Sequence, residues 1–600
     1  MRLEKLDGRT FFAAFEYGAR LVEEKKNHLN SINFFPVPDN DTGTNMSSTL
    51  ISTALKVQPT PSIDETFQSI ARNIITTARG NSGLILAQFF SGLYRKMNNH
   101  KRINTREFAE NMKQVIPYIY DNIEDPREGT MVTVIRDWAE KLPELASNID
   151  DFVSLLESSL KTAHSSLERT REQLEINKKH NTVDAGAQGF VIFLEGIVKY
   201  LQGKTNDYND LQPAAGKPGT EQRTGAVDLS QEEIDFRYCT EVLLAGDPDR
   251  QEIKTLIQDL GDSLIVVSNG ELVKIHIHTD QPAEVVNRLR ERGVIKEQKV
   301  DDMQRQQESA QKKGATTALV TDSIADIPRE LMDKYSIHQI PLNILIDGVN
   351  YLDKLTVTAD YFFDYLKEAD EFPSSSQPTV DYVYNYLMNI ADYYDSIIMI
   401  SVSDQLSGTG RAFRSAQKKV QQEKNIDIYY VDSRLNSGAQ GLLVLKAAEE
   451  IARGLKPQKL VEKIRKYRAN TRIYVNVNTF DYMIKGGRVS PLKGRLANLL
   501  NLKPIVSLDE QGKGAIAGKA ITGRGVRKKI IKKAQKMKEQ TGIEKYALVH
   551  AEAENLASEL AEEMIEVTGF ESEYIMEIST IVALNAGPGA VGLSLLGGSE

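Results

Sequence analysis

Apolar residues recur every three to four positions through the first 200 residues of the chain, which is the period of an α-helix packed on one face. The pattern is clearest over residues 11–22, 84–95, 131–145 and 184–201. No segment here alternates apolar and polar residues as a half-buried strand does. Residues 1–202 are therefore predicted to form an all-α domain, a helical bundle or barrel with a polar pocket at one end.

A change of composition separates this helical region from a smaller domain. Residues 203–229 are rich in Gly, Pro, Asn, Gln and Thr and poor in apolar residues, so they are predicted to be a linker. Residues 230–307 then alternate short apolar strands with helices, which indicates a small α/β domain. The expected strands are 238–244, 262–268 and 272–278, and the expected helices are 250–260 and 283–292.

From residue 315 onward, apolar strands alternate with helices of about ten to fifteen residues. Such alternation favours a largely parallel sheet covered by helices, so residues 315–600 are predicted to be an α/β domain. The expected strands are 318–321, 337–346, 397–402, 428–431, 473–477 and 547–550. The basic run 527–533 is expected to be the solvated face of a helix.

Composition narrows the class of protein. A chain of 600 residues is too long for one core and predicts about three to four domains. Its 41% hydrophobic and 26% charged residues are typical of a globular protein, and its net charge of −9 argues against nucleic acid as a partner. The single cysteine excludes an internal disulfide. Because neither a signal peptide nor an apolar run of membrane-spanning length is visible, a cytoplasmic location is expected.

Candidate chemistry begins with a polar turn at residues 36–46. Asp39 and Asp41 lie two positions apart, the neighbouring prolines stiffen the chain, and Gly43 lets the backbone turn sharply. Two carboxylates beside a Gly/Thr/Asn turn suit Mg²⁺ that carries nucleotide phosphates. On spacing alone, an Asx-type turn with two solvated acids fits equally well.

Two glycine turns farther along shift that balance. Residues 78–83 precede one apolar helix, and residues 183–190 open another. A glycine turn at a helix N-terminus suits an anion, although each such turn alone is more often an ordinary cap. Together with the polar turn, these segments favour a nucleotide site.

The three turns and the segment 128–134 resemble the nucleotide-binding domain of dihydroxyacetone kinases. The first turn is especially similar to that of the catalytic component of bacterial fatty acid kinase. The resemblance implies ATP and Mg²⁺ as cofactors, with Asp39 and Asp41 as the catalytic pair that binds Mg²⁺. It assigns the other nucleotide-binding positions to Thr44, Asn45, Ser82, Gly83, Thr130, Met131, Asp184 and Gly186.

A metal candidate lies in the middle of the chain. The sole cysteine, Cys239, falls in one predicted strand, and His276 and His278 lie two apart in another. Alternation puts both imidazoles on one face, so neighbouring strands would form a cluster suited to Zn²⁺. Without further evidence, two histidines spaced in this way more often lie exposed on an edge strand, with the cysteine buried. Residues 236–305 resemble the middle domain of the same fatty acid kinase component, which favours zinc, either with an open position or with a fourth ligand.

Hydroxyl-rich turns follow strands of the C-terminal domain, at residues 321–323, 374–379 and 403–409. In a parallel sheet the carboxyl ends of the strands meet at one edge, so these turns are expected to converge on one ligand. The pattern resembles the DegV family, whose members bind fatty acids. Further matching segments are 431–433, 484–488 and 587–589.

The DegV resemblance implies a buried lipid tail whose carboxylate is held by Ser375 and Ser407, with Arg488 near the entrance. Asn585 stands where the family often has a histidine that contacts the carboxylate. An asparagine amide can donate a hydrogen bond there, but it cannot become cationic.

Together the resemblances imply an ATP-dependent kinase that converts a fatty acid to an acyl phosphate, with kinase and lipid carrier in one chain. They also imply a homodimer, an acyltransferase of phospholipid synthesis as a partner that uses the acyl phosphate, and transient contact with a membrane. Two alternatives stay open. One is a kinase for a small polyol such as dihydroxyacetone, and the other is a lipid-binding regulatory protein with an inactive kinase half.

Overall fold

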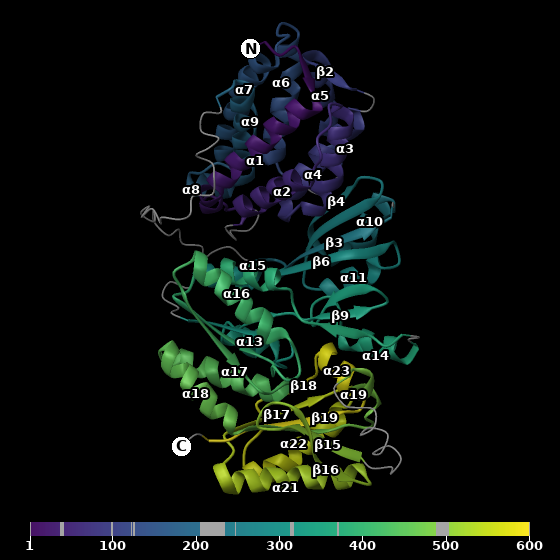
Figure 1. Cartoon of the computed structure of the whole chain (residues 1–600), viewed down its shortest axis with the longest axis vertical. Coiled ribbons are helices and arrows are strands. Elements are labelled where there is room, and N and C mark those ends of the chain that lie inside the picture. The colour runs from purple at the N-terminus through teal and green to yellow at the C-terminus, as the bar shows by residue number, and fades with distance from the viewer. Residues whose placement is uncertain are drawn as a thin grey trace. The chain divides into compact units, whose positions relative to one another are not determined.

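The computed structural model describes residues 2–35, 41–97, 100–121, 123, 126–204, 234–246, 248–311, 317–368, 371–487 and 503–598 (Figure 1). The chain divides into two compact units, unit 1 with residues 1–307 and unit 2 with residues 308–600. The predicted linker lies almost wholly outside the described residues. No helix in the described ranges is long and apolar enough to cross a membrane.

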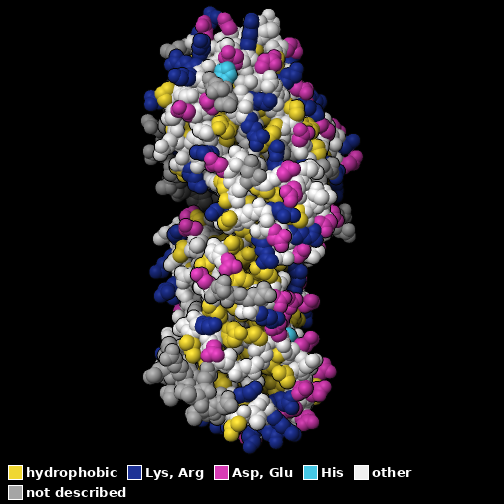
Figure 2. Space-filling view, turned by 90° about the vertical axis from the view of Figure 1, so that its right-hand side faces the viewer, with side chains coloured by type: hydrophobic (Ala, Val, Ile, Leu, Met, Phe, Trp, Pro, Cys, Tyr) yellow, Lys and Arg dark blue, Asp and Glu magenta, His cyan; other side chains and the backbone are white. Residues whose placement is uncertain are grey.

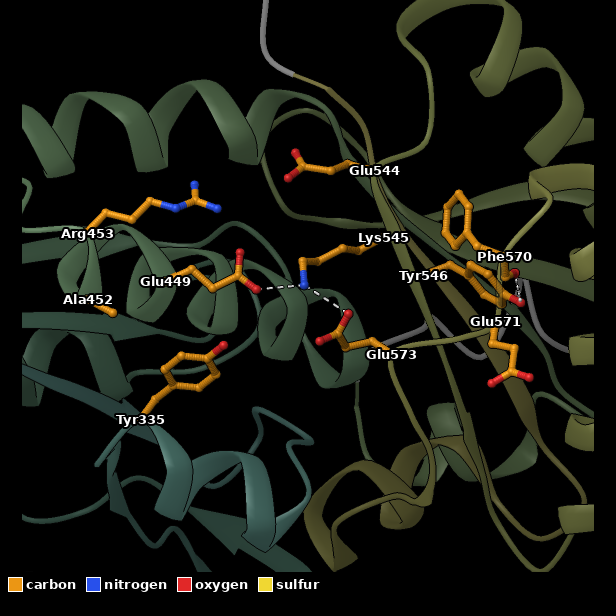
Figure 3. A pocket seen from close by; sticks show the side chains of 10 residues that line it. All are labelled: Tyr335, Glu449, Ala452, Arg453, Glu544, Lys545, Tyr546, Phe570, Glu571 and Glu573. Carbon is orange, nitrogen blue, oxygen red and sulfur yellow. Dashed lines mark hydrogen bonds and ion pairs between the residues drawn. The ribbon is translucent and has the colours of Figure 1, made fainter.

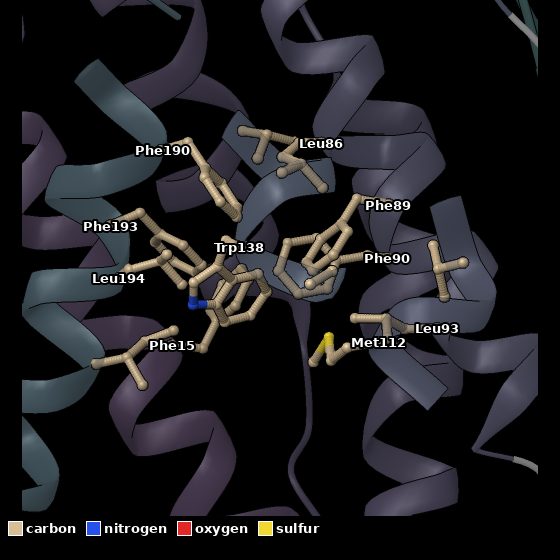
Figure 4. Packing of buried hydrophobic residues seen from close by; sticks show 14 of the residues in the cluster. Phe15, Leu86, Phe89, Phe90, Leu93, Met112, Trp138, Phe190, Phe193 and Leu194 are labelled. Carbon is tan, nitrogen blue, oxygen red and sulfur yellow. The ribbon is translucent and has the colours of Figure 1, made fainter. Parts of the chain in front are cut away.

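The first part of unit 1 is helical, as predicted, with helices packed on their neighbours along the chain and the last of them packed against the first. Its core is aromatic, with Phe15, Phe90 and Phe193 meeting edge to face (Figure 4). Trp138, the single tryptophan of the chain, lies in the same cluster and donates its indole N–H to Ser159. The helices are α1 (Gly8–Ser31), α2 (Thr42–Lys56), α3 (Ile63–Thr77), α4 (Gly80–Lys96), α5 (Thr105–Tyr120), α6 (Met131–Ala146), α7 (Phe152–Gln173), α8 (Glu175–His180) and α9 (Ala185–Leu201).

The helical domain also contains two strands, which the sequence analysis did not predict. β1 (Lys5–Asp7) pairs antiparallel with β2 (Arg102–Asn104). Each is three residues long, too short to show an alternating pattern. Each leads directly into a helix, because Asp7 caps α1 and Asn104 caps α5 through their side-chain oxygens.

The second part of unit 1, the middle domain, is built on an antiparallel four-stranded sheet in the order β4-β5-β3-β6. The three strands expected from the sequence are present, and β6 was missed because charged residues dominate its sequence. The strands are β3 (Tyr238–Ala245), β4 (Gly261–Ser268), β5 (Leu272–Thr279) and β6 (Val294–Asp302). The helices are α10 (Arg250–Ile257), η1 (Gln258–Leu260) and α11 (Pro282–Leu289), and α12 (Met303–Gln311) spans the boundary between units 1 and 2.

Unit 2 contains the predicted parallel sheet, in the order β13-β12-β7-β8. Helices α15 and α16 cover one face of it with a shared apolar core, and α17 contacts it through β7. The strands are β7 (Thr317–Asp322), β8 (His338–Ile340), β12 (Ser396–Ser401) and β13 (Asp427–Asp432). The helices of this part are α13 (Arg329–Lys334), α14 (Ala359–Glu368), α15 (Val380–Ile390), α16 (Thr409–Glu423), α17 (Ser437–Ala452) and α18 (Pro457–Ala469).

The parallel sheet is smaller than expected, because much of unit 2 is antiparallel. The six-stranded sheet β16-β15-β14-β19-β17-β18 has one parallel pair, β17 with β18. Pro341 divides the single strand expected at 337–346, since a proline cannot donate to a ladder. The elements are β9 (Asn343–Ile346), β10 (Val349–Leu352), β11 (Ser374–Ser376), β14 (Thr471–Asn476), α19 (Asp481–Lys485), β15 (Lys503–Leu508), β16 (Gly514–Ala520), β17 (Lys545–His550), β18 (Ile575–Glu577), α23 (Thr580–Ala586) and β19 (Val591–Leu596).

Two helices, α21 (Gly523–Thr541) and α22 (Glu554–Thr568), cover one face of the six-stranded sheet. On α21 the residues Val526, Ile530 and Ala534 are buried, while Lys528 and Lys532 are exposed. Dark blue Lys and Arg side chains gather at the bottom of Figure 2, the end of unit 2 at which Figure 1 labels α21. The basic run is thus the solvated face of a helix, as predicted.

Candidate active site

Two turns of the helical domain and one face of the middle sheet enclose a pocket of about 50 Å³ in unit 1. Asp41, Asn45 and Ser82 line it, so the structure brings together three residues that were predicted to bind Mg²⁺ or phosphate. Asp39 lies outside the described residues. The other lining residues are Asn33, Thr42, Gly80, Asn81, Cys239, Glu241, His276, His278, Lys299, Asp301, Met303 and Gln306.

Gly80 shapes the turn that precedes α4. Its φ of 58° lies in the left-handed region, and a Cβ at this position would come within 2.5 Å of the side-chain nitrogen of Asn45. The turn therefore requires glycine, and the N-terminal ends of α2 and α4 lie close together. Both helices start at the pocket, so their partial positive charge is directed at it.

Two predicted phosphate-binding residues lie elsewhere. Gly83 is buried against α2, where a Cβ would come within 2.5 Å of the Thr49 hydroxyl, so it serves helix packing. Thr44 is exposed and exchanges hydrogen bonds with the side chain of Asn30. Neither residue lines the pocket.

The third glycine turn meets the second. A Cβ on Gly186 would lie 3.2 Å from the Ser82 hydroxyl, 3.4 Å from an Asp184 carboxylate oxygen and 3.5 Å from the Cβ of Met131. Thr130 precedes Met131 and caps α6 without a side-chain hydrogen bond to it. The starts of α4, α6 and α9 are thus neighbours, and these predicted nucleotide-binding residues do come together.

Asp184 is the buried acid of this group. Its carboxylate accepts a hydrogen bond of 2.7 Å from the backbone N–H of Ala187. Burial raises its pKa to about 7, against the opposing effect of the backbone N–H groups of Ala187, Met131 and Gly186. A carboxyl group with this pKa changes charge near neutral pH, and a nearby cation would favour its ionised form.

The middle sheet contributes a metal-ligand cluster to the same pocket. Cys239 on β3 lies opposite His278 on β5, and the candidate ligand atoms of Cys239, His276 and His278 all lie within 4.8 Å of one another. The Nε2 atom of His276 is buried without a hydrogen-bond partner in the described chain. Asp262 lies 3.5 Å from His278 Nδ1, which is how a carboxylate orients a metal-binding imidazole. These residues fit a metal ion.

The acid–base properties of the cluster agree with this fit. Burial lowers the pKa of His276 to about 3, so its imidazole is neutral, the form that binds metals. Burial also raises the pKa of the Cys239 thiol, with further contributions from Glu241, Asp301 and Asp41. A metal ion would have to displace the thiol proton on binding.

Charged residues that the sequence analysis missed surround the cluster. Glu241 and Lys274 form an ion pair of 3.0 Å, and each is only 1% exposed. Burial would raise the pKa of Glu241, but Lys274 and Lys299 hold it far below its usual range. Glu241 also accepts the backbone N–H of Gly80 at 2.8 Å, which ties the middle sheet to the glycine turn. On β5 the polar residues Lys274, His276 and His278 alternate with apolar ones, but β3 carries only the single charge of Glu241, so no local pattern marked the pair.

A cavity of about 1090 Å³ lies in unit 2, between the carboxyl ends of the parallel strands and the six-stranded sheet. Its walls are largely apolar, with Ile473, Val506 and Val549 among the lining residues. Ser375 and Ser407 both line it, although they come from different segments of the unit. Two of the three predicted hydroxyl-rich turns, 374–379 and 403–409, therefore reach one cavity, whereas residues 321–323 do not line it. Arg488 lies outside the described residues.

Asn585 lines the same cavity from α23. Its amide nitrogen donates to the carbonyl of Ile581 at 3.1 Å, and its buried Oδ1 has no partner in the described chain. Asp353 anchors the start of this helix by accepting from the backbone and hydroxyl of Thr580. One N–H of the amide thus donates within its own helix, so fewer hydrogen-bond donors remain for a ligand carboxylate than the sequence analysis expected.

A second hollow of unit 2, of about 530 Å³, differs in character (Figure 3). Lys545 lies between Glu449 and Glu573, at 2.6 Å and 2.9 Å. Tyr546 donates to the backbone of Phe570 at its edge. Because its central cation is already paired with two carboxylates, this hollow has little attraction left for an anionic ligand.

Three parts of the chain match known families. Residues 36–199 match the DAK2 domain, residues 235–310 match the FakA-like middle domain of fatty acid kinase, and residues 316–597 match the DegV family of uncharacterised proteins. The chain unites a DAK2 domain, a FakA-like middle domain and a DegV domain. The resemblances stated from the sequence are thereby confirmed. The pocket of unit 1 lies between the DAK2 and middle domains, and the large cavity lies in the DegV domain.

Individual relatives cover part of this arrangement. Protein YloV of Bacillus subtilis is 33% identical over 318 residues, which are 52% of this chain and 58% of that protein. An uncharacterised protein of Staphylococcus saprophyticus is 33% identical over 320 residues, with the same coverage. The chain therefore spans less than two thirds of the length of these relatives.

Solved structures similar to part of the chain come from DegV proteins. One is described as DegV, a fatty acid binding protein from Bacillus subtilis, with 27% identity and a TM-score of 0.44. Another is a DegV family protein from Thermus thermophilus, described for its fatty acid binding, with 25% identity and a TM-score of 0.44. Each match covers 47% of this chain and 99% of the solved one.

Proposed function

We propose that this chain is an ATP-dependent kinase that phosphorylates the carboxylate of a fatty acid held by its DegV domain. The observation that carries the proposal is the cavity of the DegV domain, which combines apolar walls with the hydroxyls of Ser375 and Ser407. Such a site suits a single lipid tail with a polar head group. The same chain supplies a DAK2 domain whose glycine turns converge near Asp41, which supports a phosphoryl donor site.

The reaction requires little of the protein beyond positioning and charge neutralisation. A fatty acid has a pKa of about 4.5 and is already ionised at neutral pH, so no general base is needed. A carboxylate oxygen attacks the γ-phosphorus of ATP, and the bond from that phosphorus to the β,γ-bridging oxygen breaks. The products are an acyl phosphate and ADP. A site built from Asp41, Asn45 and Ser82 is suited to this chemistry, because it offers metal and phosphate ligands.

The cofactor assignments follow from the residues in the pocket. Mg²⁺ would be held by Asp41 together with Asp39, and the phosphates by Asn45, Ser82 and the helix N-termini around Asp184. Mg²⁺ would supply charge neutralisation on the phosphates. Cys239, His276 and His278 offer the thiolate and imidazole ligands that Zn²⁺ prefers.

The proposal extends to the setting of the reaction. A cytoplasmic location would supply ATP. An acyltransferase of phospholipid synthesis would consume the acyl phosphate, since a mixed anhydride is an activated acyl donor. Fusion of carrier and kinase raises the effective concentration of one for the other, and a homodimer would also allow transfer between chains.

Trapping the product tests the proposal. The purified full-length chain is incubated with ATP, Mg²⁺, palmitate and hydroxylamine, which converts an acyl phosphate to a stable hydroxamate. Wild type is expected to give hydroxamate, and Asp41→Ala is expected to lose most of it. Asp150→Asn, a change at an exposed acid of the same domain, serves as the control and keeps wild-type turnover.

The same assay separates the alternatives. Release of ADP with dihydroxyacetone but not with palmitate would establish a polyol kinase instead. Binding of palmitate without any ATP turnover would establish a lipid-binding protein with an inactive kinase half. Unchanged hydroxamate in Asp41→Ala would remove the metal-binding role of this residue.

A further inference from the structure

The charges that line the cavity of the DegV domain do not balance. Of its described lining residues, Asp404, Arg411 and Lys513 carry ionisable side chains. Asp404 is already neutralised, because one carboxylate oxygen pairs with Arg414 at 2.7 Å and the other accepts from Tyr430. The side chains of Arg411 and Lys513 have no hydrogen bond or ion pair in the described chain. The cavity therefore has an excess of positive charge.

Arg411 lies beside the predicted head-group hydroxyls. It belongs to the first turn of α16, which follows directly after Ser407 and Gly408. Its side chain folds back over that turn, so that Nη2 lies 2.9 Å from the point where a Cβ on Gly408 would stand. The side-chain oxygen of Gln377, two residues after Ser375, lies closer still to the same point. Glycine at position 408 thus makes room for a guanidinium between the two serine-bearing segments.

This placement supplies what the hydroxyls lack. Serine hydroxyls hydrogen-bond a carboxylate and an alcohol alike, so Ser375 and Ser407 cannot by themselves distinguish them. Asn585 cannot become cationic and already donates to Ile581. A guanidinium carries a permanent charge and several N–H donors in a plane that matches a carboxylate.

We propose that Arg411 binds the anionic head group of the lipid and makes the DegV domain select a charged lipid over a neutral one with the same tail. The inference rests on the proposed function and names the residue that sets its head-group specificity. Lys513 lies on the turn between β15 and β16 and adds a second charge to the cavity from a longer, more flexible side chain.

Competition binding tests the assignment without requiring turnover. Delipidated full-length chain is loaded with a fluorescent fatty acid, which is displaced by palmitate or by hexadecan-1-ol at low ionic strength. Arg411→Gln is expected to weaken palmitate binding about tenfold and to leave hexadecan-1-ol binding unchanged, since one charge-assisted contact to a partly exposed group is lost. The palmitate affinity of Arg411→Lys is expected to lie between those of wild type and Arg411→Gln. Arg465→Gln, at an exposed arginine of α18, is the matched control and behaves as wild type.

The outcomes are distinct. An equal loss for palmitate and hexadecan-1-ol in Arg411→Gln would overturn the inference, because it would show damage to the cavity rather than loss of a charge. An equal effect of Arg465→Gln would overturn it too. Retained hexadecan-1-ol binding shows that the variant is folded. If wild type prefers palmitate through Arg411 but yields no hydroxamate with ATP, the proposed kinase reaction fails and the head-group assignment stands.

Discussion

Replacing Glu241 with glutamine is expected to destabilise the middle domain, because it leaves the ammonium group of Lys274 buried without its counter-charge. Both side chains are only 1% exposed and 3.0 Å apart. Glutamine keeps the shape of the side chain and can still accept the N–H of Gly80. The substitution therefore isolates the loss of charge from the loss of packing.

The size of the effect follows from the burial of the pair. Removing one partner of a buried ion pair typically costs about 3–5 kcal/mol. A lysine can instead lose its proton, which costs about 4.5 kcal/mol at pH 7 and sets a ceiling. A double change, Glu241→Gln with Lys274→Met, should recover most of the loss.

Hydrogen exchange measured by mass spectrometry can follow the strands that carry the pair. A loss of about 3 kcal/mol corresponds to about 150-fold faster exchange for amides of β3 and β5 that open with the sheet. Glu271→Gln is the control, since Glu271 pairs with Arg72 at the surface of the same unit, with side chains 63% and 55% exposed. Its effect should stay below about 1 kcal/mol. If Glu241→Gln accelerates exchange no more than Glu271→Gln does, the buried pair does not support the sheet as argued.

Three further predictions concern single groups. Burial raises the pKa of Asp184 to about 7, so the free energy of unfolding of wild type should fall as the pH rises from about 4 to 7 and then level off. Asp184→Asn should flatten that pH dependence in guanidinium unfolding followed by tryptophan fluorescence. An unchanged pH dependence in the variant would contradict the raised pKa. His276→Ala should reduce bound zinc in elemental analysis by most of one equivalent per chain, and equal zinc in both proteins would remove the ligand assignment. Arg414→Gln should weaken palmitate binding several-fold, because it leaves the negative charge of Asp404 in the cavity without its counter-charge. Adding Asp404→Asn should restore palmitate binding. A double variant that binds palmitate as weakly as Arg414→Gln would contradict this charge argument.

The sequence predicted those elements whose apolar pattern is regular. Helices α1, α4, α6 and α9 of the DAK2 domain and the strands β3, β4 and β5 could be located from periodicity, because one face of each is buried in a core. Strand β6 could not, since charged residues dominate it and two of them, Lys299 and Asp301, face the pocket rather than a core. Alternation of strands with helices also says nothing about pairing direction, so the antiparallel six-stranded sheet was not foreseen.

The candidate sites divide in the same way. Turn motifs located Asp41 and Ser82, and a pair of histidines two apart located the metal cluster, because each has a recognisable local spacing. The buried pair of Glu241 and Lys274 and the cationic Arg411 depend on contacts between segments far apart in the chain. No local pattern marks such residues, and their roles became apparent from burial and from the partners available to each charge.

The hydrogen bond from Gly80 to Glu241 has a consequence for how such proteins can be recombined. The glycine turn belongs to the DAK2 domain, while its acceptor belongs to the middle domain, so each domain completes the other's pocket wall. A chimera that exchanges the DAK2 domain alone would place the glycine turn of another protein against the Glu241 carboxylate of this middle domain. We therefore expect the two domains to be inherited, swapped and engineered as one cassette, with viable crossover points after α12 rather than between α9 and β3.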